Sequence, residues 1–270
     1  MRIEARPLRW LTTQAVQDAS QRRLVPAVLV ISVLSLFMMD SCTSCNANVV
    51  VEGEPQSMDL SSLAGLLTFG LLAIWSIALA GLLASDHLRE IFEDGSATLW
   101  LTRPISRPTL ALGRLLGSLI VSLGAALLLC GGASFFLSIR GDLPLLPAIW
   151  ATLSVLLSCV TIASLAMMAS LFLPRLVTVL MVFGGVGLVA VLNLASAAGR
   201  PLAGLYYVVH QFGPPILSAV MAALSPWWAT GPVEVSVWDV ALRSISWALG
   251  SLALLLIVFD QIELSRLEDR

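Results

Sequence analysis

The chain has 270 residues, of which 58% are hydrophobic and only 12% are charged, and its formal net charge is −2. Soluble domains carry roughly 25% charged residues, so this composition excludes an ordinary water-soluble protein and predicts a single membrane domain, residues 1–270. All 15 basic residues are arginine, which excludes a GxxxxGK[ST] phosphate-binding loop. Because the arginines form no dense run, we expect no nucleic-acid partner.

Residues 1–23 carry five arginines and precede the first long apolar run. From Leu8 to Arg23, apolar and polar residues mix in a pattern that predicts an amphipathic helix lying along the membrane interface. An ordinary solvated amphipathic helix is the alternative. No small-residue cleavage site ends the apolar run that begins at Leu24, so we do not expect a cleavable signal peptide.

Six apolar runs approach or exceed the length of about 20 residues that a membrane span needs. They are residues 24–39, 60–85, 115–139, 145–173, 176–198 and 244–259. We therefore expect an all-α membrane protein with six transmembrane helices. The first and last runs are short, and Arg22, Arg23 and Arg243 are expected to extend them by reaching the interface. No Asp or Glu lies within the runs, which argues against an ion-coupled transporter.

The four cysteines form two pairs that lie in different contexts. Cys42 and Cys45 follow the first span in the sequence Cys-Thr-Ser-Cys, which predicts a local disulfide if that side is oxidising. Unpaired thiols and soft-metal capture are the alternatives. Cys130 and Cys159 fall within spans, where a small apolar role is expected. No catalytic set and no metal site are predicted.

The loop 86–114, between the second and third spans, holds the densest polar sequence in the chain. Its acidic residues fall at helical spacing before a glycine that can end a helix; they are Glu90, Glu93 and Asp94, followed by Gly95. Ser96 to Leu101 suits a second short helix, and Pro104 and Pro108 are expected to fix the turn into the third span. Gly113 and Gly117 have the GxxxG spacing that permits close helix contact, although such pairs also arise by chance.

This loop resembles the coupling region of the permease subunits of type-2 ATP-binding-cassette (ABC) transporters. Those permeases carry an acidic stretch after the second span, then a Gly-Thr-Leu core, a Pro-x-Ser-Arg turn and Gly-Lys or Gly-Arg. The matching residues here are the acids, Gly95-Ser96-Ala97-Thr98-Leu99, Arg103-Pro104-Ile105-Ser106-Arg107 and Leu112-Gly113-Arg114. Arg114 stands where lysine is commoner.

The resemblance implies a permease subunit that pairs with a second permease copy and docks separate ATPase subunits. Those subunits would bind the ATP and Mg, so this chain is expected to be no enzyme and to hold no cofactor. The expected ATPase contacts are Glu90, Phe92, Glu93, Asp94, Gly95, Leu99 and Trp100. The residues that we assign to the return of the loop, through carbonyls, acidic side chains or lipid phosphates, are Arg103, Pro104 and Arg107.

Other interpretations of the loop stay open. Phe92, Leu99 and Trp100 are bulky apolar residues of the kind that fill a partner's pocket, but they also suit a location at the membrane interface. The charged residues suit a simple solvated connector. At the level of function, the alternative to an exporter is a non-transporting scaffold or signalling subunit that docks an ATPase, and a lone secondary transporter ranks third.

The distribution of arginines between the two sides of the spans predicts the orientation of the chain in the membrane. With six spans, twelve arginines fall on the side of the two termini and three on the other, which places the termini and the tail 260–270 in the cytoplasm. We expect the plasma (inner) membrane of a prokaryote. Segment 199–243 then lies outside, and its apolar part, 202–228, is interrupted by His210, Gln211 and two prolines. That interruption predicts a re-entrant helix pair, with a seventh span as the alternative.

Overall fold

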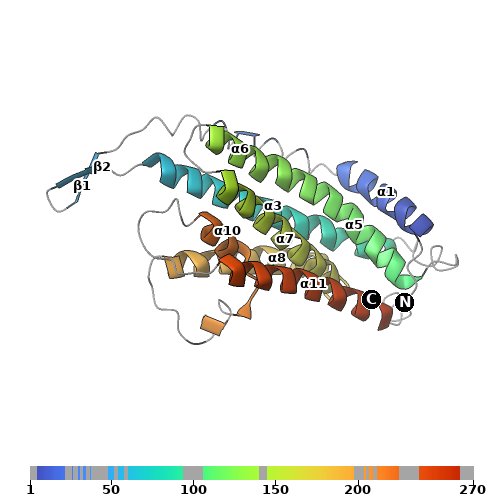
Figure 1. Ribbon diagram of the computed structural model, residues 1–270. Helices are drawn as coiled ribbons and strands as arrows, with labels where there is room; N and C mark the ends of the chain where they lie inside the picture. Colours follow the sequence, from blue (N-terminus) through green and yellow to red (C-terminus); the bar gives the residue numbers. More distant parts are fainter. Residues whose placement is uncertain are drawn as a thin grey trace.

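The computed structural model describes most of the chain. It covers residues 5–21, 48–51, 54–57, 60–93, 106–139, 145–197, 212–224 and 237–261, with isolated positions between 26 and 37 and between 204 and 208. The described residues are almost entirely helical, as predicted. The exception is a short antiparallel hairpin of β1 (Asn48–Val51) and β2 (Glu54–Ser57), which lies beyond one end of the helices (Figure 1).

Long helices lie lengthwise beside one another and form a bundle (Figure 1). In chain order the helical elements are α1 (Ala5–Gln21), α3 (Leu60–Glu93), α5 (Arg107–Ala126), the π-helical turn η1 (Leu127–Gly131), α6 (Gly132–Ile139), α7 (Leu145–Ser170), α8 (Arg175–Ala197), α10 (Ile216–Leu224) and α11 (Val237–Gln261). Elements α5, η1 and α6 follow one another without a break and make one continuous helix.

Within the described residues, five helical segments are long and apolar enough to cross a membrane. They are Thr68–Asp86, Arg107–Ile139, Leu145–Ser170, Arg175–Leu192 and Trp238–Gln261. These segments correspond to the second through sixth predicted spans, and their length and apolar composition suit a helical membrane protein. The first predicted span, 24–39, lies largely outside the described residues, so the six-span layout stays a prediction.

Two of these helices begin earlier than the apolar runs predicted. The third span was expected at 115–139, but α5 starts at Arg107, with Pro108 in its first turn, where proline's fixed φ favours a helix. The last span was expected at 244–259, but α11 starts at Val237 and has Asp239 in its first turn, where a carboxylate is stabilised by the helix dipole. Charged residues close to a helix start are thus compatible with the helix.

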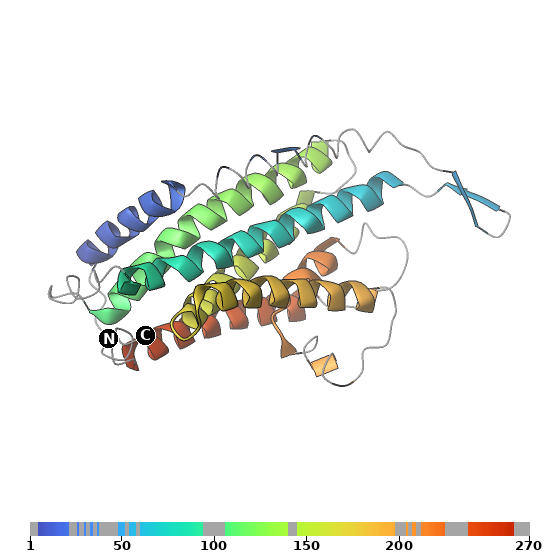
Figure 2. The ribbon, with the colours of Figure 1, turned by 180° about the vertical axis from the view of Figure 1, so that it is seen from behind.

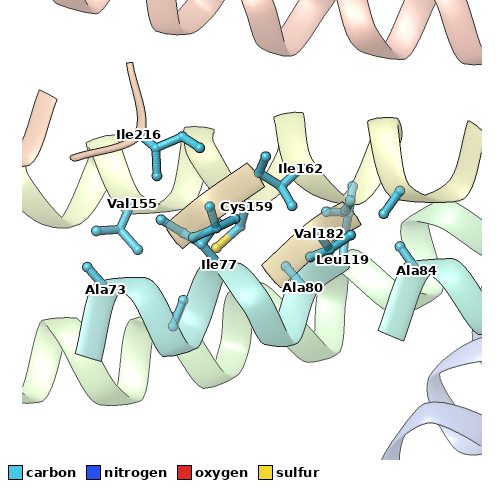
Figure 3. Packing of buried hydrophobic residues seen from close by; sticks show 14 of the residues in the cluster. Ala73, Ile77, Ala80, Ala84, Leu119, Val155, Cys159, Ile162, Val182 and Ile216 are labelled. Carbon is cyan, nitrogen blue, oxygen red and sulfur yellow. The ribbon is translucent and has the colours of Figure 1, made fainter. Parts of the chain in front are cut away.

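The core is centred on the contact between α3 and α7. The α3 side of this contact is a line of small and branched residues, Ala73, Ile77, Ala80 and Ala84, which faces Val155, Cys159 and Ile162 of α7 (Figure 3). Small side chains allow helix backbones to approach closely without lipid between them. Next to this line, a Cβ on Gly81 would lie 2.7 Å from Val182 Cγ1 of α8, so α3 packs tightly on two neighbours.

The short helix α10 has nine residues and is too short to cross a bilayer. Its Ile216 and Val220 are buried in the main core, and Ile216 lies near Val155 of α7 (Figure 3). The Arg243 guanidinium on α11 donates a hydrogen bond to the Gly213 carbonyl oxygen at 3.0 Å. The last helix does extend past Arg243 to Val237, and the Arg243 side chain contacts the chain ahead of α10.

Candidate functional site

The two helix ends that flank the loop 86–114 lie at one end of the bundle. The C-terminal end of α3, the start of α5 and the C-terminal end of α11 lie together there, and the β1–β2 hairpin lies at the opposite end (Figures 1 and 2). Helix α1 packs lengthwise on the first half of α5 (Figure 2). This end of the bundle is the candidate functional site.

Helix α3 continues into the region that was predicted to be a loop. It ends at Glu93, so Glu90, Phe92 and Glu93 are helical, as their spacing before Gly95 predicted, and they continue the second span without a break. The physical reason is that charged side chains do not break a helix, and no Gly or Pro occurs between Asp86 and Glu93. The side chains of Glu90, Phe92 and Glu93 lie outside the described part of the structure.

The other predicted contact residues fall between α3 and α5. Asp94, Gly95, Leu99, Trp100, Arg103 and Pro104 all lie outside the described residues. Arg107 is described and is the first residue of α5. The predicted disulfide pair, Cys42 and Cys45, also lies outside the described residues, whereas Cys130 and Cys159 are free and buried. No group of three or more metal-binding side chains occurs among the residues that the structure describes.

Contacts of Ser106 and the burial of the next residues determine where α5 begins. Ser106 precedes the helix in an extended conformation, and its hydroxyl lies 2.6 Å from the Thr109 hydroxyl. The Leu110 amide donates to the Ser106 carbonyl oxygen at 3.2 Å and closes the first turn. Pro108 and Thr109 are buried. Because proline has no amide proton to leave unsatisfied, its place in the first turn helps to fix where α5 begins.

Helix α1 is joined to α5 through the two glycines of the GxxxG pair. A Cβ on Gly113 would lie 2.7 Å from Leu11 Cβ, and a Cβ on Gly117 would overlap Ala15 Cβ. Both Leu11 and Ala15 are fully buried. The close helix contact that the GxxxG spacing permitted is therefore present, and the helix that makes it is α1.

An ion pair lies beside this glycine contact. Arg114 Nη1 donates to Asp18 Oδ2 at 3.0 Å, and the two side chains are 9% and 52% exposed. The buried Nε of Arg114 has no hydrogen-bond partner. The sequence singled out Arg114 only as part of the Leu-Gly-Arg pattern. Its pairing with Asp18 was not predicted, because no local signal connects residues 96 positions apart.

A second ion pair joins the end of the α3 apolar segment to the start of α8. Arg175 Nη2 donates to Asp86 Oδ2 at 2.8 Å. The Asp86 side chain is only 11% exposed, whereas the Arg175 side chain is 65% exposed. The tight turn between α7 and α8 positions Arg175, since the Leu173 amide donates to the Ala169 carbonyl oxygen at 2.9 Å. The two ion pairs thus join different pairs of helices, α1 with α5 and α3 with α8.

Comparisons with known proteins identify no family for this chain. No protein-family model matches it, and no curated protein matches it. What the site can do is therefore argued from its residues. The described part of this end of the bundle offers helix ends, two ion pairs and close helix contacts.

Proposed function

We propose that this chain is the membrane-spanning permease subunit of a type-2 ABC export-type transporter, driven by ATP that a separate partner subunit hydrolyses. The observation that carries the proposal is the ordered pattern of acids, Gly95-Ser96-Ala97-Thr98-Leu99, Arg103-Pro104-Ile105-Ser106-Arg107 and Gly113-Arg114 after the second predicted span. Order, spacing and position along the chain all agree with the coupling region of those permeases.

The arrangement of the helices supports a docking role for this region. The polar end of α3, which carries Glu90 and Glu93, and the start of α5 at Arg107 flank the pattern at one end of the bundle. Acidic groups there suit a basic surface on a partner, because complementary charges favour the correct encounter. The lack of lysine, and so of a phosphate-binding loop, agrees with ATP hydrolysis in another subunit.

The proposal includes further elements of the same kind of transporter. A second permease copy would complete the translocation path between the two membrane domains. The membrane would be the inner membrane of a prokaryote, with both termini in the cytoplasm and 202–228 as a re-entrant segment outside. Of these residues, the described α10 is buried against α7 and α11, as suits a segment covered by protein rather than by lipid.

The partner to use in the test is an ATPase with a phosphate-binding loop encoded in a neighbouring reading frame. In the first variant, Glu93→Arg and Asp94→Arg are combined, which reverses the charge of the proposed contact. We expect pull-down of the ATPase to weaken at least about tenfold, since like charges opposed across an interface cost several kcal/mol. ATP turnover of the reconstituted complex should fall with it.

The matched control combines Glu263→Arg and Glu268→Arg, which makes the same charge change in the C-terminal tail. This variant should assemble and hydrolyse ATP as the parent does. Parent-like assembly and turnover of the Glu93 and Asp94 variant would overturn the docking assignment. A parent complex that assembles but moves no compound across liposomes would favour a non-transporting scaffold instead.

A further inference from the structure

The contact between α1 and α5 brings the two helices unusually close together. Leu11 and Ala15 are one helical turn apart, and each fits against one glycine, Gly113 or Gly117, one turn apart on α5. With no Cβ in the way, the α1 side chains touch the α5 backbone. Such contacts depend steeply on distance, so a separation of even 1 Å would lose much of their dispersion energy.

The contacts at Gly113 and Gly117 alone would not fix the register, that is, the position of α1 along the axis of α5. A slide by one turn, about 5.4 Å, would still bring an α1 side chain opposite a glycine. The Arg114–Asp18 ion pair distinguishes between these registers, because its 3.0 Å hydrogen bond would not survive a shift of that size. Polar contacts at helix interfaces are best attested in this role, where they select one register rather than add much stability.

The energetics agree with a register role. The Asp18 side chain is 52% exposed, so solvent screens the pair and its net contribution to stability is small. Arg114 is held nearly buried, with its Nε lacking a hydrogen-bond partner, which is unfavourable in itself. A pair of this kind is therefore better explained by the geometry that it enforces than by the stability that it adds.

We infer that Arg114, with Gly113 and Gly117, is a positioning residue that makes α1 and the first turns of α5 one moving body. The inference rests on the proposed function in one respect, namely that ATP hydrolysis displaces the loop that leads into α5. Motion of that loop then carries α1 with it, because the two glycine contacts and the ion pair fix α1 on α5. Helix α1 is thus part of the transmission machinery and not only a membrane-surface anchor.

Hydrogen exchange on the reconstituted chain, without any ATPase, tests whether the glycines hold α1 on α5. Gly117→Ala introduces a Cβ that overlaps Ala15 and should speed exchange of the α1 amides at least about fivefold. Gly124→Ala, in the same helix but with open space around it, should leave α1 unchanged. Equal α1 exchange in the two variants would overturn the claim that the glycines hold α1.

Coupling in the assembled complex tests the positioning role. Arg114→Gln should leave ATPase pull-down and the KM for ATP unchanged while kcat falls at least about fivefold, because docking is intact and transmission is impaired. The double variant Asp18→Arg with Arg114→Asp restores the charge pair and should recover kcat. If Arg114→Gln turns over ATP as the parent does, or the exchanged pair restores nothing, the positioning role fails. A parent that binds no ATPase would instead refute the proposed function, and the exchange experiment still decides the α1–α5 unit.

Discussion

The indole Nε1 of Trp247 on α11 donates a hydrogen bond to the carbonyl oxygen of Phe212 at 3.0 Å. One turn earlier on the same helix, Arg243 donates to the neighbouring carbonyl of Gly213. Two prolines follow these carbonyls, and proline supplies no amide donor for a local backbone hydrogen bond. Side chains of α11 therefore satisfy carbonyls that the local backbone leaves open, and they set where the chain enters α10.

Removing the indole donor should make the chain that leads into α10 more mobile. In Trp247→Phe we expect amide exchange in α10 to become about fivefold faster, which corresponds to the loss of one hydrogen bond of about 1 kcal/mol. Trp238→Phe makes the same chemical change at a side chain that is 75% exposed and should have no effect on α10. Mass-spectrometric hydrogen exchange in nanodiscs measures both, and equal rates would show that the indole bond does not hold α10.

The Arg175–Asp86 pair should respond asymmetrically to the loss of each partner. Arg175→Gln removes the cation from a carboxylate that is only 11% exposed, whereas Asp86→Asn leaves a guanidinium that water already solvates. Because the loss of a counter-charge costs more at a buried charge than at an exposed one, Arg175→Gln should lower the unfolding midpoint more. Solvent screening at Arg175 keeps the difference within about 1 kcal/mol. Thermal unfolding in detergent would contradict this if Asp86→Asn were equally damaging.

Close packing of α3 on α8 predicts a strong effect at Gly81. A Cβ there would lie 2.7 Å from Val182 Cγ1 and 3.0 Å from Ile162 Cγ2, and both neighbours are β-branched and stiff. Gly81→Ala should therefore destabilise the protein by about 1–3 kcal/mol through overpacking. Gly70→Ala, with nothing within 4 Å, should be neutral or mildly stabilising because alanine favours helices. Denaturant unfolding of the two variants compares them directly.

The proposed orientation predicts which single cysteines react from which side when the four native cysteines are replaced. Thr13→Cys on α1 and Gln261→Cys at the end of α11 lie at one end of the bundle, and Gln56→Cys lies on the hairpin at the other (Figure 1). With cytoplasmic termini, a membrane-impermeant maleimide should label Gln56→Cys in intact cells and the other two only after permeabilisation. Labelling of Gln261→Cys in intact cells would reverse or reject this topology.

Five of the six predicted spans coincide with long apolar helices of the structure, because lipid-facing helices need long apolar runs and those runs are visible without any tertiary information. Helix starts were less predictable. Arg107 and Asp239 fall outside the predicted runs, yet both lie in first turns, where Pro108 favours the start of α5 and the helix dipole stabilises the Asp239 carboxylate. The GxxxG spacing of Gly113 and Gly117 indicated a close contact but could not name the neighbour.

The candidate site was predictable only in part, for a physical reason. The apolar face of α1, which includes Leu11 and Ala15, looks the same in sequence whether it meets lipid or a glycine-lined helix. The pattern therefore predicts a helix along the membrane interface but names no protein neighbour, and the structure shows that this neighbour is α5. Arg114 and Asp18 pair across 96 positions, and only the fold brings such residues together.

The length of α3 determines where a partner would meet this protein. The helix continues from Asp86, the last residue of its apolar segment, to Glu93, which adds about 10 Å at 1.5 Å per residue. With Asp86 at the edge of the hydrocarbon core, this length exceeds one headgroup layer, which is about 5–8 Å thick, so we expect the acidic tip to reach bulk water. A soluble subunit could then dock there without inserting any of its own surface into the bilayer. Because mobile ions screen exposed charges strongly, raising the ionic strength should wash such a subunit off intact membranes.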